Sequence, residues 1–180
     1  RAEGTKAGLV GSELYGKTFG VIGTGAIGTK VALLAKAFGC NVIAYSRTKR
    51  EAITQAGITY VSLEELLKQS DIVSLHVPFN DATKGFIGKE QLALMKSNAI
   101  LLNTARGGVV DNQALADALN AGNIAGAGID VYEMEPPIQK NHPLVCAKHT
   151  VLTPHVAFAS HEALYTRALI VFDNIIQWEA

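Results

Sequence analysis

Short hydrophobic runs alternate along this chain with longer segments in which apolar residues recur at helical spacing. The short runs are almost continuous in Val, Ile and Leu, which is typical of strands buried on both faces. Strands and helices that alternate in this way form a parallel sheet covered by helices. The pattern therefore predicts an α/β fold, a doubly wound parallel sheet with helices on both faces. The expected strands are Thr18–Ile22, Asn41–Tyr45, Thr59–Val61, Asp71–His76, Ala99–Asn103, Ala125–Asp130 and Thr150–Thr153.

Helix-start and helix-stop residues bound the helices between these strands. Ser62 and Asp111 are residue types that cap a helix at its first turn, because their side chains accept hydrogen bonds from free backbone N–H groups. Gly39 and Gly122 can each end a helix, since glycine adopts the left-handed conformation of a C-terminal cap. The helices predicted from these signals are Ala26–Phe38, Leu63–Gln69 and Gln113–Asn120.

A long helix is also predicted at the C-terminus, over residues 160–180, with Ser160 as its cap. Four apolar residues recur on one side of it at helical spacing, and we expect this side to join the core rather than to bind a partner. These residues are Leu164, Ala168, Val171 and Ile175.

The chain has the size of one domain. Its 180 residues are 48% hydrophobic, which is enough for a single core, so we expect one domain over residues 1–180. Residues 1–16 would form an arm that leads into the first strand. Because residue 1 is Arg rather than Met, and because the last helix stops without a cap, we expect a piece of a longer polypeptide.

Composition excludes several classes of function. Sixteen basic and sixteen acidic residues cancel, so no net charge favours nucleic acid or a membrane surface as a partner. No apolar run approaches the roughly 20 residues that span a bilayer, and no signal peptide is recognisable. Cys40 and Cys146 lack metal-ligand spacing, and no metal site is expected. A reducing, cytoplasmic setting fits these features.

A glycine-rich turn follows the first expected strand. Gly23, Gly25 and Gly28 would respectively permit the tight turn, let the backbone approach a pyrophosphate, and let the next helix pack against the strand. The N–H groups near Ala26 and Ile27 would face the anion at the helix N-terminus. The same spacing occurs in structural loops, but its place between a strand and a helix favours dinucleotide binding in a Rossmann-like fold.

The second expected strand ends at a serine where such domains commonly place an acidic residue for the adenosine ribose. Ser46 removes a charge that would repel a 2′-phosphate, and Arg47, with Lys49 or Arg50, could hold that phosphate. The sequence therefore favours NADP over NAD. The alternative is a solvated basic turn on a domain that still accepts NAD.

Four residues with chemical potential lie further along the chain. Arg106 could hold a substrate carboxylate bidentately and polarise the neighbouring carbonyl. His155 could donate a proton to a ketone oxygen during hydride transfer, and Glu135 could orient the ring and favour its charged form. Taken singly, each residue has an ordinary structural interpretation. Together with Asp130 they lie at or just beyond strand ends, where ligands gather in doubly wound folds, and they predict the reduction of a 2-oxo acid.

Six motifs follow one another along the chain, namely Leu14–Gly28, Leu75–Pro78, Asn103–Gly108, Gly128–Val131, Glu135–Pro136 and Thr153–His155. In this order they resemble the signatures of the D-isomer-specific 2-hydroxyacid dehydrogenases, a family that includes D-lactate, D-glycerate and phosphoglycerate dehydrogenases. The resemblance covers nearly the whole chain and is far more specific than the glycine spacing alone.

The resemblance implies an enzyme, an NAD(P)-dependent D-2-hydroxyacid dehydrogenase, with this chain as its nucleotide-binding domain and with its substrate domain absent from this chain. It implies that Arg106 binds the substrate and that Glu135 and His155 relay a proton. It places Asp130 near the nicotinamide carboxamide, and it also assigns cofactor contacts to Val77, Pro78, Thr83, Thr104 and Ala105.

The resemblance further implies a homodimer that acts on a small 2-oxo or 2-hydroxy acid, whose side chain the sequence does not identify. We expect the chain by itself to bind cofactor but to turn over poorly or not at all. The alternative from another functional class is a non-catalytic NAD(P)-sensing or interaction module on the same fold. The intact set of arginine, glutamate and histidine argues against that alternative, because a pure binder needs no proton relay.

Overall fold

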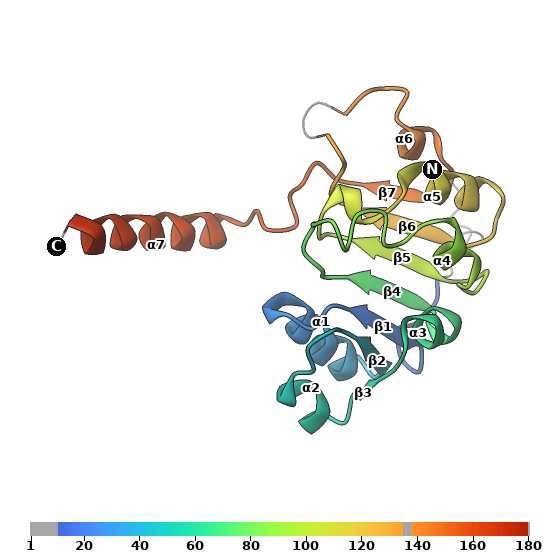
Figure 1. Ribbon diagram of the computed structural model, residues 1–180, viewed down its shortest axis with the longest axis horizontal. Coiled ribbons are helices and arrows are strands. Elements are labelled where there is room, and N and C mark those ends of the chain that lie inside the picture. Colours follow the sequence, from blue (N-terminus) through green and yellow to red (C-terminus); the bar gives the residue numbers. More distant parts are fainter. Residues whose placement is uncertain (1–10, 135–137, 180) are drawn as a thin grey trace, which may run out of the picture.

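The computed structural model describes residues 11–134 and 138–179 and contains a single seven-stranded parallel sheet (Figure 1). The strand order is β3-β2-β1-β4-β5-β6-β7. Strands β2 and β3 are therefore added on one side of β1 and strands β4 to β7 on the other, so the order of the strands reverses between β1 and β4. Ligands bind at such a switch point in doubly wound folds. The predicted fold class is confirmed. The strands are β1 Thr18–Ile22, β2 Asn41–Tyr45, β3 Thr59–Tyr60, β4 Ile72–Leu75, β5 Ile100–Asn103, β6 Gly126–Ile129 and β7 Thr150–Leu152.

The helices include the four that the sequence predicts and several short ones that it does not. Ser62 and Asp111 cap as expected, since their side chains accept hydrogen bonds from backbone N–H groups at 3.2 and 3.0 Å. The helices of four or five residues, α2, α4 and α6, are too short to show apolar periodicity. The helices are α1 Ala26–Ala37, α2 Glu51–Gln55, α3 Leu63–Gln69, α4 Lys89–Ala93, α5 Asn112–Asn120, α6 Pro143–Cys146 and α7 His161–Glu179, with a 3₁₀ turn at Gly107–Val109.

The sheet separates two hydrophobic clusters, and alternate residues of β1 belong to different ones. Phe19 and Val21 pack in the cluster that contains side chains of α1 and α2, whereas Ile22 packs in the larger cluster with α3, α4 and α5. Gly20 also faces α3, where an added Cβ would come within 2.6 Å of the Leu66 side chain. The alternation follows from the two-residue period of a strand and shows that β1 is covered on both faces.

Helix α7 extends away from the sheet (Figure 1). The expectation that its apolar side joins the core is wrong, because every residue from His161 to Trp178 is exposed, including Leu164 at 48% and Ile175 at 50%. Apolar spacing shows that a helix has a hydrophobic side but not what covers it. The predicted cap is present, with the Ala163 N–H donating to Ser160 Oγ at 3.0 Å. In the described part of the chain, neither α7 nor any other helix is both long and apolar enough to cross a membrane.

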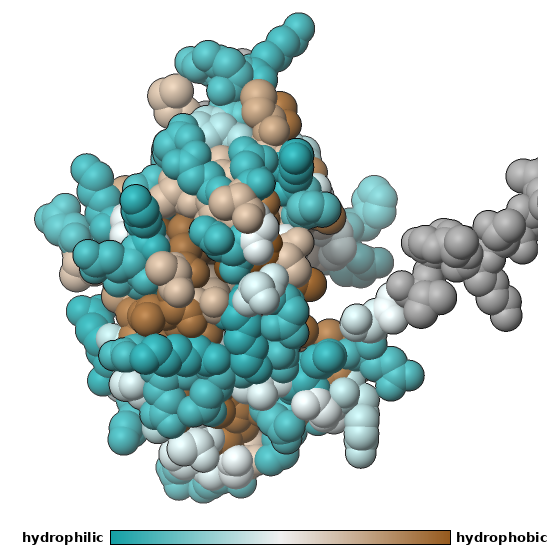
Figure 2. All heavy atoms as spheres, turned by 90° about the vertical axis from the view of Figure 1, so that its right-hand side faces the viewer, coloured by the Kyte–Doolittle hydropathy of each residue, from teal (hydrophilic) through white to brown (hydrophobic). Residues whose placement is uncertain are grey.

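The two ends of the strands form different surfaces. The strands end on the side from which α7 extends, as their arrowheads show in Figure 1. The side at which the strands begin is largely hydrophilic, with hydrophobic patches between the polar side chains (Figure 2). There Asp71, just before β4, accepts hydrogen bonds from the Thr18 N–H at 2.9 Å and from Lys96 Nζ at 3.0 Å. Among the described residues, the loops with candidate chemistry lie at the opposite end.

Candidate active site

A groove crosses the carboxyl ends of the central strands and has two connected parts. We call them the basic pocket, of about 230 Å³, and the Arg106 pocket, of about 580 Å³. Gly25, His76, Val77 and Pro78 line both parts, so the groove is continuous from one to the other. Of the predicted cofactor contacts, the basic pocket is also lined by Gly23, Ser46, Arg47 and Thr83, and the Arg106 pocket by Ala26, Ile27, Thr104, Ala105 and Arg106.

The three glycines of the turn differ in what surrounds them. Gly23 has φ +94°, and a Cβ there would lie 2.6 Å from the His76 carbonyl oxygen, so both conformation and space require glycine. A Cβ on Gly28 would overlap the Gly23 carbonyl oxygen, so glycine at this position lets α1 pack closely against the turn. Gly28 does not line either part of the groove. A Cβ on Gly25 would meet nothing within 4 Å and would point into open space. Gly25 thus leaves room at the groove surface for a ligand.

The first turn of α1 offers backbone N–H groups to this space. The first helical hydrogen bond runs from the Thr29 N–H to the Gly25 carbonyl at 2.9 Å. Within the described chain, the amides of Ala26 and Ile27 therefore have no partner from the helix itself. These amides stand at the positive end of the helix dipole, where an anion is stabilised.

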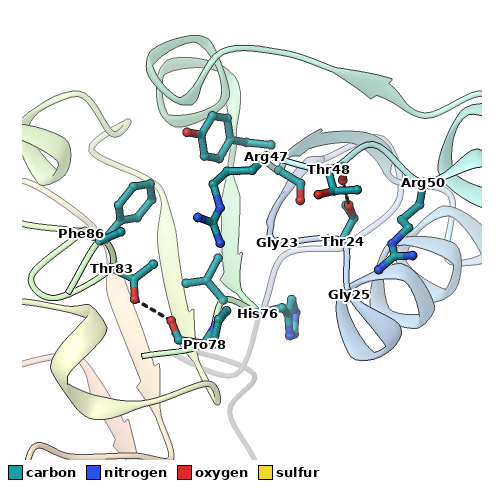
Figure 3. A pocket seen from close by; sticks show the side chains of 14 residues that line it. Gly23, Thr24, Gly25, Arg47, Thr48, Arg50, His76, Pro78, Thr83 and Phe86 are labelled. Carbon is teal, nitrogen blue, oxygen red and sulfur yellow. Dashed lines mark hydrogen bonds between the residues drawn. The ribbon is translucent and has the colours of Figure 1, made fainter. Parts of the chain in front are cut away.

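Two arginines face the basic pocket from the turn after β2. Figure 3 shows Arg47 reaching into the space between the glycine turn and the Thr83–Phe86 side, whereas Arg50 points towards Gly25. The sequence left Lys49 and Arg50 as alternatives. Of these two, Arg50 lines the pocket, while Lys49 Nζ lies 5.8 Å from the ring centre of Tyr60. None of the described residues that line this pocket is acidic.

His76 stands where the two parts of the groove join, a position for which the sequence suggested only a strand end. Its Nε2 lies 2.9 Å from Ser74 Oγ, and burial lowers the pKa of its imidazole from 6.5 to about 4. The ring is therefore neutral near pH 7. It can contribute a hydrogen-bonding group and ring surface to the groove, but not a positive charge.

Arg106 lies at the far end of the groove, three residues beyond β5. It is exposed, and its Nη1 donates to the Ala105 carbonyl at 2.6 Å, which leaves other donors of the guanidinium fork available. The turn is held by Asn103, whose Nδ2 donates to the Arg106 carbonyl at 3.0 Å and whose Oδ1 accepts from the Ala105 N–H at 3.0 Å. Asn103 is fully buried, so the sheet fixes the backbone that carries the arginine.

Asp130 follows β6, the neighbour of β5, and His155 follows β7, the next strand along the sheet. Asp130 directly follows β6 and is only 3% exposed. Burial by itself would raise the pKa of its carboxyl. The hydrogen bonds from Thr153 Oγ1, Val156 N and Ala157 N, together with the nearby His155, outweigh this effect and hold the pKa below its usual range.

The buried carboxylate therefore organises the loop that carries His155, and neither residue lines the two pockets of the groove. The ends of the three strands are in register, since Asn103 pairs with Ile129 and Ile129 with Leu152. Arg106, Asp130 and His155 thus emerge from adjacent strand ends. Glu135, the third predicted member of the relay, lies outside the described residues.

Comparison with known proteins adds to this geometry. The family model for the D-isomer specific 2-hydroxyacid dehydrogenase, NAD binding domain, matches residues 1–157. The chain belongs to this family. It is 47% identical over 169 residues to glyoxylate reductase from Aeropyrum pernix, and the match covers 93% of the chain and 50% of the relative. This member of the dehydrogenase family thus spans about half the length of that relative.

Two solved structures show the same fold with different cofactors. D-lactate dehydrogenase from Aquifex aeolicus, complexed with NAD and lactic acid, is 37% identical with a TM-score of 0.86, covering 97% of this chain and 58% of the other. An acyclic imino acid reductase in complex with NADPH and D-Arg is 35% identical with a TM-score of 0.86, covering 98% and 55%. This dehydrogenase-family chain is therefore similar both to an NAD complex and to an NADPH complex.

The groove of this dehydrogenase-family domain fits a dinucleotide. The open space at Gly25, the first amides of α1, which no carbonyl of the helix accepts, and the arginines of the basic pocket suit phosphate groups. Sequence reasoning missed several lining residues, because their types are common in any loop and only the fold brings them together. These residues are Thr24, Tyr45, Thr48, His76, Phe79, Ala82 and Phe86.

Proposed function

We propose that the protein interconverts a D-2-hydroxy acid and its 2-oxo acid with an NAD(P) cofactor, and that this chain is its dinucleotide-binding domain. The observation that carries the proposal is the single groove that begins at the glycine turn and ends at Arg106. Similarity to glyoxylate reductase and D-lactate dehydrogenase, which are named for a 2-oxo acid and a 2-hydroxy acid, supports this class of substrate.

Residues 1–180 are proposed to form one nucleotide-binding domain. The substrate domain would be formed by residues outside this chain. This proposal is supported by the length of the glyoxylate reductase, of which the chain covers 50%. In this arrangement Arg106 would face the substrate domain across the groove. The chain alone should then bind cofactor but show little or no turnover.

Each candidate residue of this chain has a proposed role in the reaction. A bound reduced nicotinamide supplies the hydride. Arg106 would hold the carboxylate of the 2-oxo acid in a bidentate grip and polarise the carbonyl beside it. His155 would donate a proton to the oxygen on C2, and in the reverse direction its neutral ring would accept that proton. Glu135 would keep the ring oriented and charged, and Asp130 would contact the nicotinamide end; the role of Glu135 rests on sequence alone.

The cofactor is proposed to be NADP rather than NAD. Support comes from Arg47 and Arg50 at the basic pocket and from Ser46 in place of an acidic residue. A carboxylate there would accept hydrogen bonds from the ribose of NAD and would repel a 2′-phosphate. The competing interpretation is that the arginines are solvated and the domain uses NAD. We also propose, from the family resemblance, that the protein is a homodimer and, from its cysteine usage, that its setting is cytoplasmic.

A titration of the chain with NADPH and with NADH at fixed salt, followed by nicotinamide fluorescence, tests the cofactor proposal. Tighter binding of NADPH, lost in Arg47→Ala, would support it. Equal or tighter binding of NADH would refute the NADP preference but keep the dinucleotide site. If neither cofactor binds to a folded chain, the proposed site is not formed by this chain alone.

Turnover separates the dehydrogenase from a non-catalytic NAD(P)-sensing module. The complete protein should reduce small 2-oxo acids at the expense of the reduced cofactor. Cofactor binding without consumption of any 2-oxo acid in a panel from glyoxylate upwards would favour the sensing module.

A further inference from the structure

Tyr60 lies behind the wall of the basic pocket and connects two parts of that wall. It is the second residue of the edge strand β3 and pairs with Ala44 of β2. Its hydroxyl oxygen is 2.9 Å from Thr24 Oγ1 in the glycine turn and 2.8 Å from the backbone nitrogen of Arg50 in the basic turn. Thr24 and Arg50 line the pocket, whereas Tyr60 is not among the described residues that line it. Tyr60 therefore acts on the pocket only through these neighbours.

The hydrogen bonds around Tyr60 form a chain with one consistent direction. The Arg50 N–H can only donate, so the Tyr60 oxygen accepts it. The Thr24 hydroxyl donates to the Thr48 carbonyl oxygen at 3.3 Å, so its own oxygen is left to accept the Tyr60 proton. The chain begins at Arg50 and ends at Thr48. Within the basic turn, residues 47–50, it thus fastens Thr48 and Arg50 to the glycine turn (Figure 3 shows the Thr24–Thr48 bond).

Burial makes this connection hard to replace with water. Thr24 is 1% exposed, so its hydroxyl depends on protein partners. The same tyrosine ring lies 5.8 Å from Lys49 Nζ, which is the basic side chain of the turn that does not line the pocket. One residue therefore contacts three consecutive positions of the basic turn, directly or through Thr24. A turn held in this way loses less conformational freedom when its arginines bind a phosphate.

We propose that Tyr60 is a positioning residue for cofactor selection, whose hydroxyl holds the basic turn so that Arg47 and Arg50 meet a 2′-phosphate in a prearranged geometry. The inference rests on the proposed preference for NADP. A cofactor with a free 2′-hydroxyl lacks the phosphate group that this proposal places against the two arginines. Its affinity should therefore depend much less on how the turn is held.

Adenosine 2′,5′-bisphosphate and adenosine 5′-monophosphate are the probes, because they differ only in the 2′-phosphate. Their dissociation constants would be measured by calorimetry at fixed salt for the wild-type chain, Tyr60→Phe, Thr24→Val and the double variant. Tyr60→Phe should weaken the bisphosphate about threefold to tenfold, the usual effect of one hydrogen bond, and change the monophosphate less than about twofold. Thr24→Val breaks the same chain, so the double variant should lose little more of the preference than either single variant.

Tyr165→Phe is the matched control, since it removes an exposed tyrosine hydroxyl on α7 and should leave both constants unchanged. A wild-type preference for the bisphosphate that survives Tyr60→Phe would overturn the role of Tyr60 alone. Equal weakening of both probes would also overturn it, because the hydroxyl would then support the glycine turn in general. A wild-type chain that binds both probes equally would refute the NADP preference, and the inference with it.

Discussion

The backbone N–H of His155 donates to the carbonyl oxygen of Asp130 at 2.8 Å, which ties the loop that carries the imidazole to the end of β6. His155 has φ +55°, a left-handed conformation that non-glycine residues adopt at a cost of the order of 1 kcal/mol or more. The carboxylate of Asp130 holds the next two amides of the same loop. Asp130 therefore maintains a backbone conformation that the loop would not be expected to keep alone.

Replacing this carboxylate should loosen the loop. In Asp130→Asn, the amide nitrogen would face at least one N–H or hydroxyl group that now donates to oxygen, and a buried donor would lose its partner. We expect the free energy of unfolding to fall by about 1–3 kcal/mol, measured by urea denaturation at pH 7. Asp173→Asn, on exposed α7, is the control and should change stability by less than about 0.5 kcal/mol. Equal stabilities of the two variants would contradict this role of Asp130.

The pH dependence gives the same prediction a second readout. Because the folded pKa of Asp130 lies below its ordinary value of 3.8, its carboxylate contributes fully above that value and the contribution is lost as the pH falls below it. The stability difference between the wild type and Asp130→Asn should therefore be present at pH 7 and shrink as the pH falls below 3.8.

His76 should make the fold sensitive to mild acid. Its pKa falls from 6.5 to about 4 on folding, so the folded state favours the neutral ring. Stability from this group is complete above pH 6.5 and is lost as the pH falls from there towards 4. Between pH 7 and pH 5 the wild type should lose about 2 kcal/mol more than His76→Gln. His161→Gln, an exposed substitution, should follow the wild type; a His76→Gln profile parallel to the wild type would contradict the burial effect.

Gly25 and Gly28 should respond differently to the same added methyl group. Alanine at Gly28 would overlap the Gly23 carbonyl and should destabilise the fold by about 1–3 kcal/mol. Alanine at Gly25 meets nothing within 4 Å, and its φ of −68° is ordinary, so stability should be retained. Its methyl group projects into the groove, and NADPH affinity should fall at least about tenfold. Thermal unfolding and fluorescence titration of both variants check the contrast; a Gly25→Ala chain with normal affinity would place the cofactor elsewhere.

The sheet could be predicted from the sequence because strands buried on both faces leave an almost continuous apolar run. All seven strands were found, and Gly23 and Arg106 were placed correctly at their carboxyl ends. His76 was not recognised as part of the groove, since a polar residue at a strand end looks the same whether it meets solvent or a pocket. The exposed position of α7 was missed for a related reason. Periodicity describes one helix and contains no information on its neighbours.

The hydrogen bonds by which Tyr60 connects the two turns could not be predicted from the sequence either. They depend on the pairing of β3 with β2, which brings the ring beside a turn ten residues earlier and a second turn thirty-six residues earlier. A two-residue strand has too few positions to show a period. The residue types, tyrosine and threonine, are common in strands and loops and carry no signal by themselves.

The exposed side of α7 should contribute little to the stability of this chain. Leu169 is 47% exposed, whereas Leu115 of α5 is fully buried in the larger hydrophobic cluster. Leu115→Ala should lower the free energy of unfolding by about 2–5 kcal/mol, and Leu169→Ala by less than about 0.5 kcal/mol. Chemical denaturation of the two variants makes the comparison with the same substitution. A large loss for Leu169→Ala would show that this side of α7 is covered in solution, by this chain or by a second copy of it.

The final prediction concerns the proposed proton donor and uses the complete protein, because turnover is proposed to need the substrate domain. His155→Gln should lower kcat for 2-oxo acid reduction roughly 10²–10⁴-fold, the usual contribution of a positioned acid or base. NADPH affinity should change little, since His155 lines neither pocket of the groove. His161→Gln, six residues further along the chain and exposed, is the control and should keep wild-type turnover. A folded His155→Gln enzyme with more than about half the wild-type kcat would assign the proton transfer to another group.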